Sequence, residues 1–305
     1  MLLGGIEGGG TKYVCAVADE HGHLLDRIVI LTTDPQTTLK QVVTYFKQQE
    51  TAQGEKLAAI GIGSFGPIDL QRGSPHYGYI TSTPKAGWQF ADVTGPIKAA
   101  FPNIPVGFDT DVNTAALGEH QWGAAQNWDT FIYLTVGTGI GGGGMLGGRL
   151  MHGLIHPEMG HVLLPKHTDD PLERGVCPFH PNCLEGLASG PSLKARWGMP
   201  GETLPVDHAA WEIEATYLAT AVMDFLCTCS PQGVILGGSV MHQKQLFPLV
   251  RAQVLRLVNH YLVHPRMDTL DDLIVPPALG DDAGVMGAIA LALLAIDEAE
   301  RGADI

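Results

Sequence analysis

The sequence predicts an α/β fold in which one domain is duplicated. The order strand, glycine turn, strand, glycine turn, strand begins near residue 2 and again near residue 130, about 128 residues later. Strands and helices then alternate after each copy, which is typical of α/β proteins. The 305 residues include 39 glycines, about 13% against a usual share of about 7%, and 45% are apolar. We therefore expect two glycine-rich domains with a large core.

Composition restricts the class of partner. The 18 Lys and Arg residues against 32 Asp and Glu give a net charge of −14, which disfavours nucleic acids and anionic membranes as partners. The chain shows no apolar run near 18 residues and no secretory leader pattern at its start. Five unevenly placed cysteines predict reduced thiols or metal ligands rather than a disulfide framework. We expect a cytoplasmic protein.

Each element of the first half follows from a local pattern. Apolar runs that meet at glycine turns predict three antiparallel strands at Leu2–Ile6, Tyr13–Ala18 and Leu24–Leu31. A helical pattern and buried runs then predict, in chain order, a helix at Gln36–Gln49, a strand at Leu57–Ile62, a helix at Asp92–Ala100, a strand at Val106–Phe108 and a helix at Val112–Trp122.

The second half begins the same way. Apolar runs predict strands at Thr130–Val136 and Ile140–Leu146, and a third strand after the turn Gly147-Gly148. Residues 153–183 are irregular, and the remaining patterns predict helices at Asp207–Cys229, Gln243–Tyr261 and Gly284–Ala299 with a strand at Gly233–Leu236. We predict an N-terminal domain, residues 1–117 completed by helix 284–305, and a larger domain, residues 118–283.

Three glycine turns are candidate phosphate-binding loops. They lie at Glu7–Lys12, Val136–Gly144 and Ile235–Val240, and backbone N–H groups at such turns can approach an anion closely. The first could equally be an ordinary hairpin turn. A second strand follows each of the first two turns, whereas the dinucleotide fingerprint needs a helix there, so ATP is favoured over NAD. We expect these glycines, including Gly137–Gly144, at turns that approach the nucleotide.

The motifs occur in the order found in the ROK family, and the chain resembles that family along nearly its whole length. They are E-G-G-G-T-K, S-F-G-P-I-D, T-D-V-N-T-A-A-L-G-E, V-G-T-G-I-G-G-G, H-P-E-M-G-H and L-G-G-S-V. Segments 78–88 and 177–186 look like those of zinc-containing bacterial fructokinases. The resemblance implies duplicated actin-like ATPase (ribonuclease H-like) domains with an active-site cleft between them. It also implies nucleotide contacts from Gly9, Gly10, Thr11, Lys12, Thr138, Gly139, Pro191, Gly237, Gly238 and Ser239.

Transfer of a phosphoryl group to a hydroxyl needs a base, and Asp111 is the candidate. From its position between a strand and a helix, Asp111 could instead be a helix N-cap. The resemblance places the catalytic aspartate on Asp111. Asp109 is an alternative base. Most relatives have an Asn that contacts the sugar at the position of Thr110, so we expect Thr110 to lie in the sugar site. The resemblance further implies sugar contacts from Glu158, His161 and Glu185, with Gly66 and Pro67 as a backbone wall, whereas Asp69 could simply stabilise that turn.

Cys177-x-x-His180-x-x-Cys183, with His161 upstream, has the ligand types of a tetrahedral zinc site. The spacing alone could arise by chance, and the resemblance favours zinc, in an insertion at residues 153–185. One ring nitrogen of His161 would bind zinc while the other faces the sugar. We expect the other histidines, including His21, His152, His156 and His208, at the surface or in turns, and Cys227 and Cys229 in core packing.

These features together predict an ATP-dependent sugar kinase that makes fructose 6-phosphate, with Mg²⁺ on the ATP phosphates and structural Zn²⁺. Glucose or mannose specificity is the nearest alternative. A sugar-sensing repressor would need a DNA-binding segment before Glu7, and a non-catalytic scaffold would not need Asp111. The family resemblance also implies a homodimer. Domain closure would exclude water and suppress ATP hydrolysis.

Overall fold

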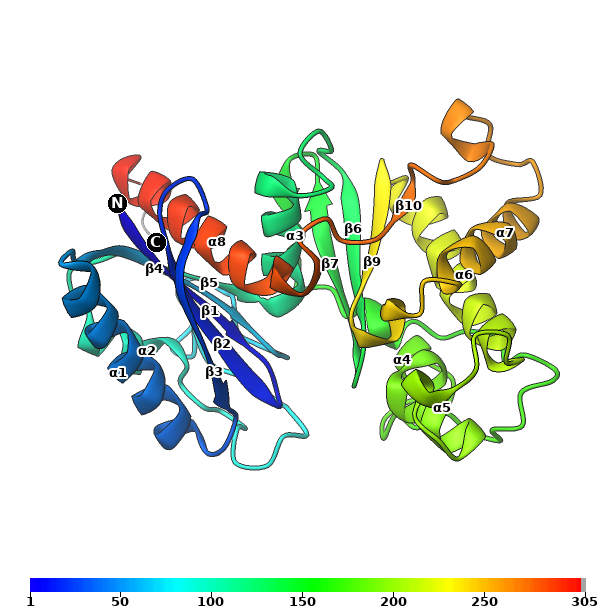
Figure 1. Cartoon of the computed structure of the whole chain (residues 1–305), viewed down its shortest axis with the longest axis horizontal. Helices are drawn as coiled ribbons and strands as arrows, with labels where there is room; N and C mark the ends of the chain where they lie inside the picture. Colours follow the sequence, from blue (N-terminus) through cyan, green and yellow to red (C-terminus); the bar gives the residue numbers. More distant parts are fainter. Residues whose placement is uncertain (303–305) are drawn as a thin grey trace. The chain divides into compact units, whose positions relative to one another are not determined.

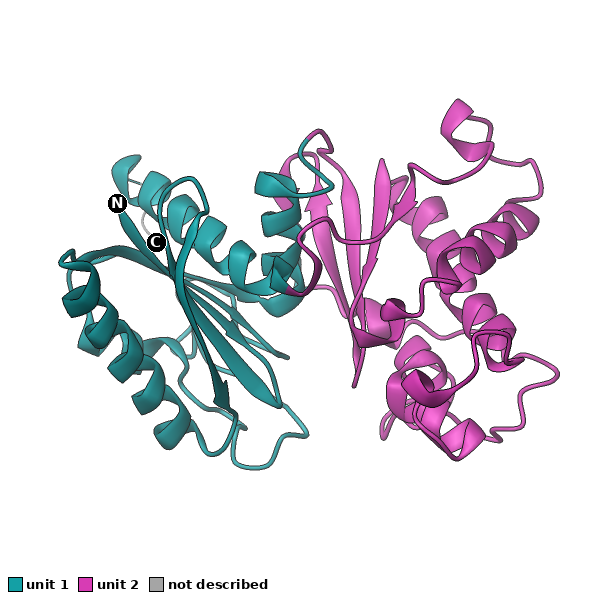
Figure 2. Cartoon of the chain, in the orientation of Figure 1, with its two compact units in different colours: residues 1–126, 151–156, 282–305 teal, residues 127–150, 157–281 magenta. Residues whose placement is uncertain are grey.

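The computed structural model describes residues 1–302, which form two compact units (Figure 2). Unit 1 comprises residues 1–126, 151–156 and the C-terminal stretch from Asp282, and unit 2 comprises residues 127–150 and 157–281. Unit 1 therefore includes residues 118–126 and 151–156, which lie outside the range predicted for the first domain. No helix within residues 1–302 has both the length and the apolar character needed to cross a membrane.

Unit 1 contains a five-stranded sheet in the order β3-β2-β1-β4-β5 (Figure 1). Strands β1, β2 and β3 are antiparallel neighbours, and β4 and β5 continue the sheet parallel to β1. The strands are β1 (Leu2–Gly8), β2 (Lys12–Ala18), β3 (Leu24–Leu31), β4 (Leu57–Ser64) and β5 (Val106–Thr110). The parallel strands β1, β4 and β5 end at one edge of the sheet, where α/β proteins bind ligands.

Helices cover both faces of this sheet (Figure 1). They are α1 (Pro35–Gln53), α2 (Thr94–Ala100), α3 (Asp111–Trp122) and α8 (Ala283–Glu300). Helices α1 and α2 lie over the main apolar core, which includes Phe46, Ile60 and Trp88. Helix α8 packs on the opposite face, where Ile289 and Ala292 join residues of the strands.

Two glycines permit the close packing of α8. A Cβ on Gly61 of β4 would lie 1.9 Å from the carbonyl oxygen of Ala288, and one on Gly287 would lie 1.7 Å from the carbonyl oxygen of Thr114 in α3. Both neighbours are backbone atoms, which cannot yield as a side chain could. Part of the high glycine content therefore serves helix packing rather than turns.

Unit 2 repeats the topology of unit 1. Its sheet has the order β10-β9-β6-β7-β8, in which β6, β7 and β8 are antiparallel neighbours and β9 and β10 run parallel to β6. The strands are β6 (Phe131–Val136), β7 (Ile140–Leu146), β8 (Arg149–Leu150), β9 (Gly233–Gly237) and β10 (Ile274–Val275). The predicted duplication is confirmed by this correspondence.

The helices of unit 2 follow its first three strands. The α-helices are α4 (Leu184–Ala188), α5 (Gly190–Trp197), α6 (Ala210–Cys229) and α7 (Leu246–Val258). Short 3₁₀ helices complete the chain: η1 (Met159–His161), η2 (Gly201–Thr203), η3 (Ser239–His242) and η4 (Pro265–Met267) in unit 2, and η5 (Gly280–Asp282) at its junction with unit 1. Helices α4 and α5 lie between residues 183 and 207, where the sequence patterns assigned no element.

One expectation about the glycines is wrong. Gly141–Gly144 do not form a turn but lie within β7. A Cβ on Gly142 would lie 2.6 Å from side-chain atoms of Leu134 and Met159, and one on Gly144 would lie 2.1 Å from the carbonyl oxygen of Phe131. These glycines are needed for strand packing, and the turn itself is confined to Gly137–Gly139.

Candidate functional site

In unit 2 the turn between β6 and β7 is held by backbone bonds and by one carboxylate. The Gly137 N–H donates to the Gly139 carbonyl at 2.9 Å, and the Gly190 N–H at the start of α5 donates to the Gly137 carbonyl at 2.8 Å. Glu185 Oε2 accepts from the Ile140 N–H at 3.0 Å. A Cβ on Gly139 would lie 2.7 Å from that oxygen. Glu185 thus holds the second glycine turn.

A cavity of about 730 Å³ opens beside this turn. Its walls come from the β6–β7 turn, α5, η2, α6 and η3. Of the predicted nucleotide residues, Thr138, Pro191 and Ser239 line it, and Lys194 and Trp211 add a cation and an aromatic ring. The cavity is large enough for a small-molecule ligand.

The third glycine turn places Ser239 at the cavity. Gly238 has φ +87°, and a Cβ there would lie 2.5 Å from backbone atoms of Val136. Only glycine fits both the left-handed backbone and this close approach. Gly237 packs instead against the hydroxyl of Tyr133, where a Cβ would lie 2.6 Å away.

In unit 1 the first glycine turn leaves its polar groups accessible. The Gly9 N–H donates to the Lys12 carbonyl at 2.9 Å, and the Thr32 hydroxyl donates to the Gly9 carbonyl at 2.7 Å. A Cβ on Gly10 would meet nothing within 4 Å, and both Thr11 and Lys12 are exposed. This turn has room for a ligand, and the exposed Lys12 supplies a positive charge beside it.

The end of β5 separates the roles of three consecutive residues. Thr110 is the N-cap of α3, since its Oγ1 accepts from the Asn113 N–H at 3.1 Å. Asp111 is the first residue of the helix and is half-buried, so the alternative of Asp111 as the N-cap is wrong. Asp109 is buried, and its carboxylate accepts from the Thr110 N–H at 2.7 Å and from the Asn113 side chain at 2.9 Å. Asp109 is therefore structurally engaged, whereas Asp111 is partly accessible.

Residues 151–156 cross from β8 to the same edge of unit 1. The Met151 carbonyl accepts from the Asn113 side chain at 3.1 Å, and the Ile68 N–H donates to His156 Nε2 at 3.0 Å. His152 Nε2 lies 2.7 Å from Asp109 Oδ2, and this hydrogen bond raises the pKa of His152. His156 is buried, so its expected surface position is wrong, whereas His152 is exposed as expected and also pairs with Asp109.

The Gly66–Pro67 segment follows β4 and lies beside His156. A Cβ on Gly66 would lie 3.4 Å from the His156 ring. Asp69 accepts from the Gln71 N–H at 2.9 Å and from the Ser74 hydroxyl at 2.6 Å, so it stabilises the turn. Sequence reasoning missed the partnership of this turn with residues 151–156. The available signal was the presence of two histidines, His152 and His156, four residues apart in this segment.

Four metal-ligand candidates converge in unit 2. One ligand atom from each of His161, Cys177, His180 and Cys183 lies within 4.8 Å of all the others. Both imidazole Nδ1 atoms lie 3.9 Å from the Cys177 sulfur. Tetrahedral zinc with bonds of about 2.0–2.3 Å would need ligand separations of about 3.3–3.8 Å, so the arrangement fits such an ion after small shifts. Cys183 also caps α4, because its sulfur accepts from the Gly186 N–H at 3.3 Å.

Glu158 directly precedes η1, which contains His161, and Glu185 lies in the first turn of α4. His161 Nε2 is 4.0 Å from Glu158 Oε2, while its Nδ1 faces the sulfur of Cys177. Burial, with the nearby charge of Glu185, raises the pKa of Glu158 to about 7. The two ring nitrogens of His161 therefore face different groups, the cysteine and the carboxylate.

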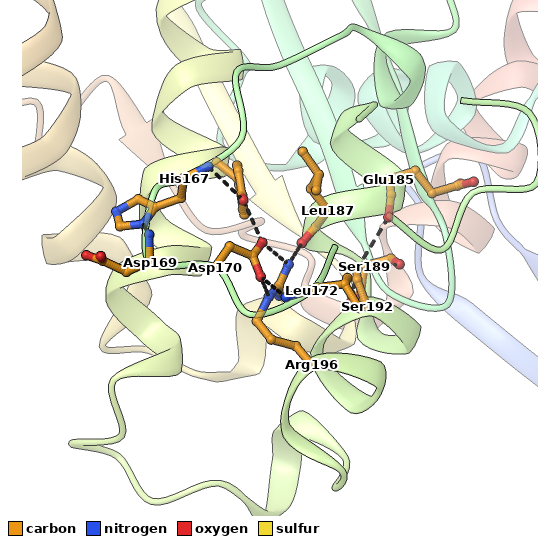
Figure 3. Close-up of polar contacts among 10 residues, drawn as sticks. His167, Asp169, Asp170, Leu172, Glu185, Leu187, Ser189, Ser192 and Arg196 are labelled. Atoms are coloured by element: carbon orange, nitrogen blue, oxygen red, sulfur yellow. Dashed lines mark hydrogen bonds and ion pairs between the residues drawn. The ribbon is translucent and has the colours of Figure 1, made fainter. Parts of the chain in front are cut away.

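Behind the cavity, α5 is anchored by a buried ion pair that sequence reasoning missed (Figure 3). Arg196 donates to both oxygens of Asp170, at 2.8 and 3.0 Å, and to the Leu187 carbonyl at 2.7 Å. The Tyr217 hydroxyl donates to Asp170 at 2.6 Å. Both charged side chains are fully buried. The network joins the irregular stretch, α4, α5 and α6, and no local pattern indicates a pair 26 residues apart.

Comparisons with known proteins agree with the topology. The model of the ROK family matches residues 3–295. A relative in Bacillus subtilis (strain 168) is 47% identical over 99% of both chains, and the fructokinase of Pediococcus pentosaceus is 44% identical over 98% of this chain and all of its own. The crystal structure of a ROK hexokinase from Thermus thermophilus superposes with a TM-score of 0.79 at 27% identity, covering 98% of this chain and all of that one.

Proposed function

Because this chain belongs to the ROK family, we propose that it is an ATP-dependent fructokinase that phosphorylates the 6-hydroxyl of fructose. The observation that carries the proposal is the similarity, at 42–45% identity over 87–98% of this chain, to four proteins named fructokinase. The cavity at the β6–β7 turn would serve as the nucleotide site, and the half-buried Asp111 would serve as the base.

The nucleotide is assigned to the three glycine turns. In unit 2, the cavity would accept ATP with its phosphates near Thr138 and Gly139 and beside Pro191, Gly238 and Ser239. The Gly237 backbone supports that turn. In unit 1, Gly9, Gly10, Thr11 and Lys12 would contact phosphate, and the lysine would offset negative charge in the transition state. Mg²⁺, when bound to the ATP phosphates, would neutralise charge that develops on transfer.

Asp111 is the proposed general base. It begins α3 at the carboxyl end of β5, and its half-buried side chain can reach solvent. A carboxylate there would take the proton from the attacking sugar hydroxyl. The alternative base, Asp109, already accepts three hydrogen bonds, from Thr110, Asn113 and His152.

Sugar recognition is assigned to polar side chains and to one backbone turn. Glu158, His161 and Glu185 would bind hydroxyls, and the Gly66–Pro67 backbone would form a wall. Thr110 Oγ1 already caps α3, so its contribution to the sugar would be through its position beside Asp111. Hydrogen-bonding groups of this kind discriminate strongly between polyols, because an analogue leaves them unpaired.

Zinc is proposed at His161, Cys177, His180 and Cys183. The four-ligand convergence supports a closed structural site, with no position for a reacting water. The metal would hold His161 so that Nε2 faces Glu158, and it would tie the irregular stretch to α4 through Cys183. Family resemblance also leads us to propose a homodimer in the cytoplasm, and light scattering of the purified protein tests the oligomeric state.

The function is tested by ADP release with fructose, mannose, glucose and N-acetylated hexoses as acceptors. We expect the highest kcat/KM for fructose. A higher value for glucose or mannose would replace fructose by that sugar, and no ADP release with any sugar would refute kinase activity. Chromatographic identification of fructose 6-phosphate against fructose 1-phosphate determines the hydroxyl that reacts.

A further inference from the structure

We propose that His152, held in place by Asp109, is a sugar-binding residue that contributes to hexose specificity, an inference that rests on the proposed kinase function. His152 lies outside all of the sequence motifs discussed above. The structure nevertheless places it beside the residues assigned to the sugar and to proton transfer.

The first step is the position of the imidazole. Asp109 is the penultimate residue of β5, and Asp111 begins α3 two residues later. His152 Nε2 lies 2.7 Å from Asp109 Oδ2, so the ring sits at the carboxyl end of β5. Ligands of α/β sheets bind at this end of the strands.

The second step is how firmly the segment is held. Asn113 donates both to Asp109 at 2.9 Å and to the Met151 carbonyl at 3.1 Å, which fixes the residue before His152. Four residues further, His156 accepts from the Ile68 N–H, next to Pro67. His152 is therefore fixed between the two parts of unit 1 proposed to meet the sugar, the end of β5 and the Gly66–Pro67 turn.

The third step is that one side of the His152 ring faces a buried carboxylate while the other side is accessible. The Asp109 side chain is only 3% exposed, whereas that of His152 is 46% exposed. Within residues 1–302, Nε2 is occupied by Asp109 and Nδ1 has no hydrogen-bonding partner. A carboxylate that orients one nitrogen leaves the other in a fixed direction. Nδ1 can then accept from a sugar hydroxyl, or donate to its oxygen when the ring is protonated.

A purely structural role for His152 would be to satisfy the buried Asp109, and two amide substitutions separate the roles. In His152→Gln the amide nitrogen can reach the position of Nε2 and donate to Asp109, but nothing replaces Nδ1. In His152→Asn the amide lies near Nδ1 but is too short to reach Asp109. A structural role predicts that Gln is tolerated better than Asn, and a sugar contact predicts the reverse order for fructose binding.

The experiment measures kcat and KM for fructose and for ATP in the wild type, both variants and His23→Asn. His23 is the matched control, since it pairs with Asp19 at 2.8 Å on an exposed turn outside the proposed site. We expect KM for fructose to rise at least about tenfold in His152→Gln, less in His152→Asn, with KM for ATP unchanged. Calorimetric titration with fructose should show the same order.

A KM for fructose within about twofold of wild type in His152→Gln would overturn the proposal. So would a loss in both variants that tracks their thermal unfolding temperatures rather than the order given above. Wild-type protein that phosphorylates no sugar would instead refute the proposed function itself. The two failures are distinguished by the wild-type measurement.

Discussion

Replacing Asp170 by Asn tests whether the buried ion pair determines the stability of unit 2. Asp170 accepts from Arg196 Nε and Nη2, from the Tyr217 hydroxyl and from the Leu172 N–H, at 2.6–3.0 Å. An asparagine offers one oxygen and turns an N–H₂ group toward donors that need an acceptor. Arg196 would then stay buried without a counter-charge, and its Nη1 already has no hydrogen-bonding partner among residues 1–302.

Breaking a fully buried pair by removing one partner costs about 3–5 kcal/mol, because the remaining charge is uncompensated. We expect the free energy of unfolding, from urea titration followed by tryptophan fluorescence, to fall by that amount in Asp170→Asn. Combining it with Arg196→Met should recover much of the loss, since no charge is then stranded. The control is Glu298→Gln, which breaks the more exposed Arg72–Glu298 pair at 2.9 Å and should cost less than about 1 kcal/mol. A loss for Asp170→Asn no larger than the control would refute the reasoning.

Three further predictions concern the base, the metal and a buried carboxyl group. Asp111→Asn should keep fructose and ATP binding in titration calorimetry yet lower kcat by orders of magnitude, and near-wild-type turnover would remove Asp111 from the role. Elemental analysis should find one zinc per chain, and Cys177→Ser with Cys183→Ser should lose it together with thermal stability; much less than one zinc in folded wild-type protein contradicts the site. Burial raises the pKa of Glu214 well above its ordinary value, and neither of its oxygens has a partner within the described chain. The folded state therefore favours the protonated form, so this stabilising contribution is present below the unfolded pKa of about 4.3 and is lost as pH rises. Glu214→Gln should then be more stable than wild type at pH 8 and lose that advantage near pH 4; an advantage that does not change with pH would argue against a titrating Glu214.

Local patterns predicted the two sheets because the information was local. Apolar runs such as Tyr13–Ala18 and Ile140–Leu146 alternate with glycine turns, and the strands that were predicted differ from the observed ones by only a few residues. The short strand β10 was not predicted. The run Gly141–Gly144 was misread, since its glycines are required by contacts with β6 and Met159 rather than by a turn. Nothing in the run itself distinguishes these two uses of glycine.

The site was predictable to the extent that motifs carry it. The Cys-x-x-His-x-x-Cys spacing and upstream His161 indicated a cluster that the structure brings together. By contrast, the pairing of Asp109 with His152 joins residues 43 positions apart, and the Asp170–Arg196 pair depends on how α5 packs. Such contacts depend on the tertiary structure, so neither the periodicity nor the spacing of the residues predicts them.

The assembly of unit 1 from three separate stretches has a consequence for synthesis of the chain. The last residue of unit 2 is number 281, whereas the α8 helix that covers one face of the β1–β5 sheet begins at residue 283. On the ribosome, the second unit therefore has its whole sequence available before the first. The unit that begins at the N-terminus must wait, with Gly61 and the surrounding strands uncovered on that face, until the final helix emerges. Truncating the chain before α8 would remove a layer of the N-terminal unit while leaving the sequence of the C-terminal unit whole.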